Sequence, residues 1–371
     1  LSEVDWIKEF SLPYNIGSFY KPANLQFLRM KYDLIVSCGS SVGYLYHHGV
    51  KSDVFIPFGY DLYHTPFVKN QFKNIKNFKS AIAFSTWLMW LALAQNKGIK
   101  NTRLVISNQN WTVMEQSIQK IGASAVNLPR LMVYNKGYLL TPNAEWTFLQ
   151  QHDFIVFSQS RHYWKSNPEL IPDFEQHGGL KRNDKLIHAF ARFIRQSKFK
   201  SPILILFAYG YDVEASKNLI DELGIERNVK WMPIMDRKSI MSALPYVSLG
   251  ADQFRQGWSG TSGGSGSEIL AASKPLITYT NGAINDPSDP FYGSPIIDAL
   301  EEEEIINVFL DYELAPQKYE NIGRLSGEWF DENLGVGLAK KYLKLFTWLY
   351  ENPLKKINQN QADVLLNQHI E

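Results

Sequence analysis

Short apolar runs rich in β-branched and aromatic residues alternate with longer segments of helical spacing along most of this chain. The runs that we interpret as strands are Tyr32–Ser37, Ser52–Pro57, Arg103–Ser107, Phe154–Ser158, Ile203–Tyr209, Val229–Met232, Tyr246–Gly250 and Pro275–Tyr279. The segments that we interpret as helices are Ser80–Lys97, Thr112–Ile121, Asp184–Ser197, Ala215–Leu223, Arg237–Leu244 and Glu268–Ala272. Strands that alternate with helix-length connections are typical of parallel sheets. The pattern therefore predicts an α/β fold.

A turn-rich segment, Val133–Glu145, divides this pattern into two halves, and 371 residues are enough for two domains of ordinary size. We place the first domain at residues 1–147 and the second at residues 148–335. The last segment, residues 336–371, contains the amphipathic run Leu338–Tyr350. We expect this run to form a helix that crosses back to the first domain.

Composition excludes several classes of protein. A chain that is 45% hydrophobic and 20% charged is globular, not disordered. Cys38 is the only cysteine, so the chain can form no intrachain disulfide and no cysteine metal cluster, and its eight histidines lack metal-binding spacing. No signal peptide is recognisable, and the longest apolar run, Ala81–Ala94, suits a buried helix better than a membrane span. We therefore expect a cytoplasmic protein without a metal or cofactor.

Charge is distributed unevenly, although the net charge is only +1. Residues 1–150 carry 15 Lys and Arg against 8 Asp and Glu, whereas residues 151–371 carry 23 against 29. Within the basic half, Lys69, Lys73 and Lys76 recur at helical spacing with large apolar residues between them. Such a segment can lie on an anionic membrane surface at the inner face of the membrane, or it can be a solvated helix face over a core stripe. Both interpretations stay open, and no nucleic-acid partner is expected.

A glycine-rich run, GTSGGSGS at residues 260–267, stands directly before Glu268. It could be a flexible linker. It could also be an anion-binding cradle, because glycines let backbone N–H groups approach a ligand and the helix that follows presents its positive end. The run lies between a predicted strand and a predicted helix of one repeating pattern, which favours the cradle.

Two cations accompany this cradle. Arg161 directly follows a predicted strand, and Lys181 stands at the start of a predicted helix, where a positive charge does not complement the helix dipole. Cations and helix N–H groups together can neutralise the charge of a departing diphosphate. Open α/β sheets bind ligands at the carboxyl ends of their strands, where these groups are predicted to lie.

The order of Arg161, Lys181, Gly210 and GGSGSEILAASKPLIT resembles the C-terminal domain of retaining GT-B glycosyltransferases, family 4 in particular. This resemblance implies two Rossmann-like domains with parallel sheets that face each other across a cleft, the second domain binding the nucleotide-sugar. It implies that Arg161 and Lys181 hold the donor diphosphate and that Glu268 binds the ribose hydroxyls. The further donor-site residues that it implies are Gly210, Pro233, Met235, Gly263, Gly264, Ser265, Gly266 and Ser267. The glutamate that the family carries eight positions before the ribose glutamate is replaced by Gly260.

The first half resembles the acceptor domain of the same family more weakly. Phe55-Ile-Pro-Phe-Gly-Tyr-Asp-Leu62 stands where the family has a turn that faces the donor sugar. Asp61 is therefore a catalytic candidate beside Arg161 and Lys181, although an Asp that caps a turn is the alternative. The acceptor-side candidates are Gly59, Tyr60, Asn108 and Asn110.

The resemblance implies transfer of a sugar from a UDP- or GDP-linked donor to a glycan or lipid-linked acceptor, with retention. We expect no metal ion, because Arg161, Lys181 and the amides of residues 263–268 can supply the charge stabilisation that Mg²⁺ gives in other transferases. A role in polysaccharide biosynthesis would fit such an acceptor. Two alternatives remain: a non-catalytic GT-B protein that binds a glycan or a partner transferase, and a GT-B sugar epimerase.

Overall fold

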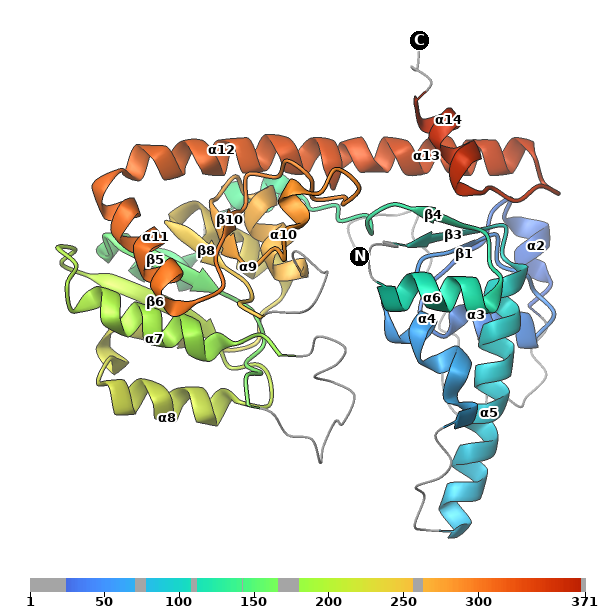
Figure 1. The fold of residues 1–371 in the computed structure, drawn as a ribbon, viewed down its shortest axis with the longest axis horizontal. Helices are drawn as coiled ribbons and strands as arrows, with labels where there is room; N and C mark the ends of the chain where they lie inside the picture. Colours follow the sequence, from blue (N-terminus) through green and yellow to red (C-terminus); the bar gives the residue numbers. More distant parts are fainter. Residues whose placement is uncertain are drawn as a thin grey trace. The chain divides into compact units, whose positions relative to one another are not determined.

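The computed structural model describes residues 25–70, 78–107, 112–141, 143–165, 180–255 and 263–367, with only the backbone of residues 68–70 and 78–88. The chain divides into two compact units, each built on a parallel sheet (Figure 1). Leu1–Arg130 and Tyr342–Glu371 form the first unit, and Leu131–Lys341 forms the second.

The first unit has four parallel strands in the order β1-β2-β3-β4. Their bounds are β1 Val36–Ser37, β2 Val54–Phe55, β3 Leu104–Ser107 and β4 Ala125–Asn127. Three of these strands lie inside runs that the sequence predicts. The sequence does not predict β4, because three residues with one buried apolar side chain, Val126, give too short a pattern.

Helices cover both sides of this sheet. In chain order they are α2 Phe27–Lys31, α3 Ser41–His47, α4 Tyr60–Tyr63, the 3-10 helix η1 Thr65–Asn70, α5 Phe78–Asn101, α6 Thr112–Ile121, α13 Val336–Glu351 and α14 Gln359–Asn367. Within this unit α4 and α6 lie on one side of the sheet, and α14 and the end of α13 lie on the other (Figure 1). The sequence predicts α6 with its observed bounds, and it predicts α5 and α13 with ends a few residues short.

A buried amide fixes the two loops that follow β1 and β2. Gln95 of α5 is fully buried, and its Nε2 donates hydrogen bonds to Gly39 O and Asp61 O, both at 2.9 Å. Its Oε1 accepts from Gly43 N in α3 at 3.2 Å. Helices α3 and α5 pack so closely that a Cβ at Gly98 would lie 2.6 Å from Val42 O. The loops at the carboxyl ends of β1 and β2 are therefore held from behind by α5.

The long apolar run Ala81–Ala94 lies within α5. Where its side chains are described, Leu91, Ala92 and Ala94 are buried, but Met89, Trp90 and Leu93 are 42%, 50% and 40% exposed. The expectation of a buried helix is therefore wrong for one face. Among the described residues, no helix is both long enough and apolar enough to cross a membrane.

The basic segment is only partly within the described residues. Lys69 lies in η1, and only the backbone of this residue is described. Lys73 and Lys76 lie outside the described residues. The membrane-surface interpretation therefore stays a prediction.

Arg103 joins the end of α13 to the sheet of the first unit. Its Nη2 donates to the carbonyls of Leu349 and Asn352 at the end of α13, and its Nη1 pairs with Asp53 at 3.1 Å. Asp53 is 3% exposed and also pairs with Arg29 at 2.6 Å. A guanidinium that binds the last carbonyls of a helix stabilises its negative end. This contact holds the C-terminal segment in the first unit.

The second unit has six parallel strands in the order β10-β9-β8-β5-β6-β7. Their bounds are β5 Phe154–Ser158, β6 Pro202–Phe207, β7 Val229–Met232, β8 Leu249–Ala251, β9 Leu276–Thr278 and β10 Ile297–Asp298. The α-helices are α7 Asn183–Ile194, α8 Val213–Leu223, α9 Arg237–Ala243, α10 Gly264–Ala271, α11 Glu302–Leu314 and α12 Pro316–Asn333. The 3-10 helices are η3 Lys136–Leu140, η4 Ala144–Gln151, η5 Glu226–Asn228, η6 Leu244–Tyr246 and η7 Ala283–Asn285.

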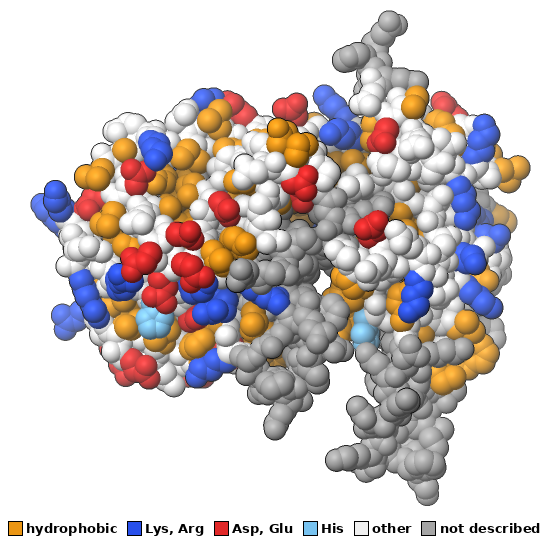
Figure 2. All heavy atoms as spheres, in the orientation of Figure 1, with side chains coloured by type: hydrophobic (Ala, Val, Ile, Leu, Met, Phe, Trp, Pro, Cys, Tyr) orange, Lys and Arg blue, Asp and Glu red, His pale blue; other side chains and the backbone are white. Residues whose placement is uncertain are grey.

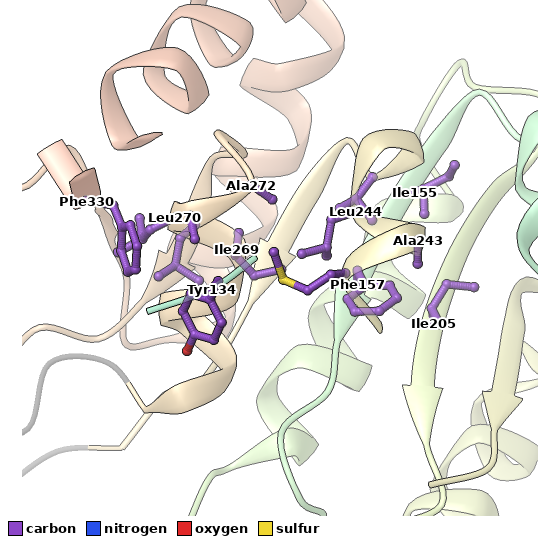
Figure 3. Close-up of a cluster of buried hydrophobic side chains, with 14 of the residues drawn as sticks. Tyr134, Ile155, Phe157, Ile205, Ala243, Leu244, Ile269, Leu270, Ala272 and Phe330 are labelled. Carbon is purple, nitrogen blue, oxygen red and sulfur yellow. The ribbon is translucent and has the colours of Figure 1, made fainter. Parts of the chain in front are cut away.

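The central strands of this sheet are buried on both faces, as parallel strands between two helical layers are. In β5, Ile155 and Phe157 point into a core formed with α9, α10 and Phe330 of α12 (Figure 3). Phe154 and Val156 point into a second core formed with α7 and α11. The uninterrupted apolar pattern of β5 follows from this double burial, and β5 and β7 have the bounds that the sequence predicts.

Several elements of the second unit differ from the prediction. Leu244–Tyr246 forms a 3-10 turn, so β8 begins later than the predicted run Tyr246–Gly250. Strand β10 has only two residues. The sequence analysis missed α12 because small residues dominate its buried face: a Cβ at Gly323 would lie 2.6 Å from Ser273 O.

The acidic run Glu301–Glu304 is the solvated start of α11. Glu301 and Glu304 form a capping box at the N-terminus of α11. Lys185 of α7 pairs with Glu301 at 2.9 Å, and Arg192 pairs with Glu303 at 2.6 Å. Figure 2 shows acidic and basic side chains intermixed on the face drawn there, consistent with such pairs.

Candidate functional site

The strand order of the second unit places a topological switch point between β5 and β8. From β5 the sheet continues through β6 and β7 in one direction, and from β8 through β9 and β10 in the other, so the loops that follow β5 and β8 diverge. Ligands bind at such points in open α/β sheets. A pocket of about 430 Å³ lies at this position. Its lining residues are Gln159, Ser160, Arg161, Lys181, Phe207, Tyr209, Ile234, Met235, Arg237, Ile240, Gly263, Gly264, Ser265 and Glu268.

Part of the glycine-rich run is helical. The predicted helix Glu268–Ala272 begins four residues too late, since α10 starts at Gly264. Gly263, Gly264 and Ser265 line the pocket, whereas Gly266 and Ser267 do not belong to its lining. The first N–H groups of a helix lack intrahelical acceptors, so this helix start offers donors to a ligand. Gly260 lies outside the described residues.

A buried carboxylate that the sequence analysis missed holds this helix start. Asp252 directly follows β8 and is 2% exposed. Its Oδ2 accepts from Gly263 N at 2.9 Å, and its Oδ1 accepts from Ser265 Oγ at 2.7 Å and from Ser160 Oγ at 2.5 Å. Asp252 thus ties the loop after β5, the loop after β8 and the start of α10 together. The position of Asp252 directly after a predicted strand is a sequence signal that could have marked it as a site residue.

Glu268 lines the pocket from α10 and is 7% exposed. Its Oε1 accepts from Arg237 Nε at 2.9 Å, and its Oε2 accepts from Gln159 Nε2. Burial raises the pKa of Glu268, while Arg237 and Gln159 act in the opposite direction. Neither partner was predicted from the sequence. Gln159 immediately follows β5, which could have drawn attention to it, but no sequence pattern distinguishes Arg237 from other surface arginines.

The two predicted cations both line this pocket. Lys181 is fixed through its backbone, since its N donates to Tyr163 O at 2.6 Å and its O accepts from Phe254 N at 3.0 Å. Its Nζ donates to Gln253 Oε1. Removal from water lowers the pKa of Lys181; Asp252 raises it, and the nearby Arg161 and Arg255 lower it. Arg161 and Lys181 thus stand within electrostatic reach of each other, an arrangement that an anion would stabilise.

An apolar wall faces these charges. Met235 lines the pocket together with Ile234 and Ile240, whereas the predicted contact residue Pro233 is exposed and does not belong to the lining. Gly210 also lies outside the lining. It adopts φ +114°, and a Cβ there would lie 2.4 Å from His162 O, so this glycine allows the loop after β6 to pack on the loop after β5.

The candidates of the first unit that the structure describes, Gly59, Tyr60 and Asp61, follow β2. The Asp61 carboxylate is 7% exposed and accepts from the backbone N–H groups of Phe58, Gly59 and Gly39 at 2.9, 2.8 and 2.9 Å. Burial raises the pKa of Asp61, and these hydrogen bonds act in the opposite direction. The contacts are those of a turn cap, the alternative weighed for Asp61. A catalytic role of Asp61 stays a prediction.

The neighbours of Asp61 have distinct environments. Gly59 adopts φ +133°, which favours glycine. Tyr60 is 46% exposed and its ring lies 4.3 Å from that of His64, measured between centroids. Asn108 and Asn110 lie outside the described residues, so their acceptor-side role stays a prediction.

Within the described parts of the chain, no three His, Cys, Asp or Glu side chains gather in a way that could hold a metal ion. The expectation that the protein works without a metal stays a prediction.

No protein-family model matches this chain, and no curated protein sequence matches it. Solved structures do match. Sucrose-phosphate synthase from Thermosynechococcus elongatus has a TM-score of 0.53 at 13% identity, over 91% of this chain and 78% of that one. Anabaena HepE, solved with UDP and glucose, has a TM-score of 0.52 at 16% identity, over 87% and 81% of the two chains. S. aureus TarM, solved as a variant with fondaparinux, alpha-GlcNAc-glycerol and UDP, has a TM-score of 0.52 at 12% identity, over 86% and 57%. With its two parallel sheets, this chain therefore has the α/β fold of GT-B glycosyltransferases.

Proposed function

We propose that the protein is a glycosyltransferase that moves a sugar from a UDP-linked donor to a glycan or lipid-linked acceptor. The observation that carries this proposal is the composition of the pocket at the switch point. Arg161, Lys181 and the start of α10 supply positive charge and N–H donors, and Glu268 supplies a carboxylate. A nucleoside diphosphate has the complementary groups: phosphate oxygens, ribose hydroxyls and a flat base.

The nucleotide would lie across the pocket. Its diphosphate would bind Arg161, Lys181 and the α10 amides, and its ribose hydroxyls would donate to Glu268. The apolar wall at Met235 suits the base. Uridine is preferred over guanosine because HepE and TarM, which share the fold, were solved with UDP.

We propose transfer with retention. The bond between the sugar's anomeric carbon and the diphosphate oxygen breaks as the acceptor oxygen bonds to that carbon on the same face. The acceptor proton passes to the leaving phosphate. Arg161, Lys181 and the helix amides stabilise the charge that grows on the diphosphate, which is the task that Mg²⁺ has in other transferases. The assignment to family 4 and the retention rest on the sequence resemblance.

The acceptor is proposed to bind the first unit. The excess of Lys and Arg in residues 1–150 suits an anionic or lipid-linked glycan at the inner face of a membrane. Vesicle co-sedimentation tests this part separately. We expect the protein to bind anionic but not neutral vesicles, and to lose this binding at high salt. If it co-sediments with neither kind of vesicle, a soluble acceptor is favoured.

Calorimetric titration of UDP, GDP and ADP tests the donor site. UDP should bind most tightly, and Glu268→Ala should weaken UDP binding by about 1.5–3 kcal/mol through loss of charge-assisted hydrogen bonds. If UDP affinity is the same in both proteins, the ribose assignment is wrong. UDP binding without turnover on any glycan acceptor would support the non-catalytic alternative. Loss of transfer in EDTA would overturn the metal-free mechanism.

A further inference from the structure

One wall of the pocket is rich in hydrogen-bond acceptors, beginning with Gln159. Its Nε2 donates to Ser265 O at 3.1 Å and to Glu268 Oε2. Since both partners only accept, the nitrogen of this amide must face them, and Oε1 must face away. Gln159 Oε1 is buried and has no donor within the described residues. Gln159 is thus a residue of the pocket lining whose amide oxygen has an unused capacity to accept a hydrogen bond.

Asp252 turns two serine hydroxyls into further acceptors. Ser160 Oγ and Ser265 Oγ both donate to Asp252 Oδ1, at 2.5 and 2.7 Å, and Gly263 N donates to Oδ2 at 2.9 Å. An ionised carboxylate cannot donate, and a serine hydroxyl has one proton. The two hydroxyl oxygens lie 3.4 Å apart, but Asp252 Oδ1 is the nearer acceptor for each of them. Each serine therefore directs its proton at Asp252 and has only lone pairs left for a ligand. Both serines line the pocket.

Other groups that line the pocket have the reverse polarity. Arg161, Lys181 and the first N–H groups of α10 can only donate. Phosphate oxygens, which accept, fit these donors and would meet lone pairs at the hydroxyl oxygens of Ser160 and Ser265. A hydroxyl group can donate, so it fits the serines.

We propose that Ser160 and Ser265, oriented by Asp252, accept hydrogen bonds from hydroxyl groups of the sugar that is transferred. The inference rests on the proposed function and names how the donor sugar is recognised. The buried carboxylate of Asp252 lies behind two hydroxyls and acts through them. Asp252 is a positioning residue in this scheme, and the serines are specificity-determining residues.

Calorimetric titration with UDP and with UDP-glucose, UDP-galactose and UDP-GlcNAc tests the proposal. The wild type should bind at least one UDP-sugar more tightly than UDP. Ser160→Ala and Ser265→Ala should each weaken binding of that UDP-sugar about 3- to 10-fold more than they weaken binding of UDP, the effect of one neutral hydrogen bond. Ser326→Ala is the matched control: this buried serine of α12 donates to Ile322 O at 2.9 Å and lies outside the pocket lining.

The outcomes separate the inference from the proposed function. Equal weakening of UDP and UDP-sugar binding in the serine variants would assign the serines to the ribose or the phosphates and overturn the inference. A wild type that binds none of the three UDP-sugars more tightly than UDP would also overturn the inference. Recognition of UDP itself would still stand in that case. A wild type that binds no uridine nucleotide would refute the proposed donor itself.

Asp252→Asn gives a readout that a purely structural role would not change. An Asn side chain can donate to the serines, which frees their protons to point into the pocket. Fluorine accepts weakly and cannot donate, so the wild type should bind deoxyfluoro analogues of its preferred UDP-sugar less tightly wherever the replaced hydroxyl contacts a serine. Asp252→Asn should show less discrimination between hydroxyl and fluorine at that position. If Asp252→Asn weakens binding of the UDP-sugar and of its deoxyfluoro analogues equally, discrimination between hydroxyl and fluorine is unchanged. That result would refute the orienting role of Asp252.

Discussion

Replacement of Arg237 by Met should make nucleotide binding more sensitive to acid. Arg237 Nε lies 2.9 Å from Glu268 Oε1, while its side chain is 57% exposed, so solvent screens much of the attraction. For an exposed pair we expect about 1 kcal/mol or less, which is less than about one unit in the pKa of Glu268. Because Arg237 lowers that pKa, its removal should raise it further.

The sign of the effect on binding follows from the role of the carboxylate. Ribose hydroxyls donate to ionised Glu268, so UDP affinity should fall as pH decreases through the raised pKa of Glu268. In the ligand-free protein the sign is opposite. A raised carboxyl pKa contributes stability that is present at low pH and is lost as pH rises through the folded pKa.

Calorimetric titration of UDP between about pH 5 and 8 measures the shift, since this range lies above the reference pKa of a Glu side chain. In Arg237→Met the decline in affinity should begin at a higher pH than in the wild type. Glu268→Gln should bind weakly with little pH dependence. Lys238→Met is a matched control, because Lys238 is the neighbouring cation of α9 and lies over the Tyr138 ring at 5.9 Å. Coincident pH profiles of Arg237→Met and the wild type would refute the reasoning.

Three further predictions concern other residues. Lys181→Ala should lower the turnover number more than the UDP affinity, because the charge of Lys181 matters most as the diphosphate departs. Steady-state kinetics and calorimetric titration of UDP measure the two quantities, and equal losses in both would mean that Lys181 acts in ground-state binding. Arg103→Met should destabilise the protein by about 2–3 kcal/mol in urea unfolding, since it removes a buried partner of Asp53 and the carbonyl contacts at the end of α13; an unchanged midpoint would contradict that anchor. Gly210→Ala should lower the melting temperature and weaken UDP binding, because a Cβ at φ +114° would press on the His162 backbone and displace the loop that carries Arg161; a variant as stable as the wild type would show that the loop after β6 yields easily.

The sequence predicts the β5-to-β9 framework well because doubly buried parallel strands leave long apolar runs. It predicts Arg161, Lys181 and Glu268, which the structure brings to one pocket, from their order along the chain. It fails where a local pattern is overruled by a tertiary contact. The helix α10 begins within glycines because Asp252 binds Gly263 N and Ser265 Oγ, and α12 buries glycines against Ser273. The acceptor polarity of Ser160 depends on a partner 92 positions away, which no local pattern reveals.

The return of α13 to the first unit has a consequence for synthesis and folding. The second unit is one continuous stretch, Leu131–Lys341, and can close as soon as it has left the ribosome. The first unit is assembled from two separate stretches, Leu1–Arg130 and Tyr342–Glu371, and the hydrogen bond from Arg103 to Leu349 spans 246 positions. Contacts of such separation form slowly and after local ones. Strands β1 to β4 therefore wait for Tyr342–Glu371 to be made, and truncation after Lys341 should leave the first unit, not the second, as the substrate for chaperones and proteases.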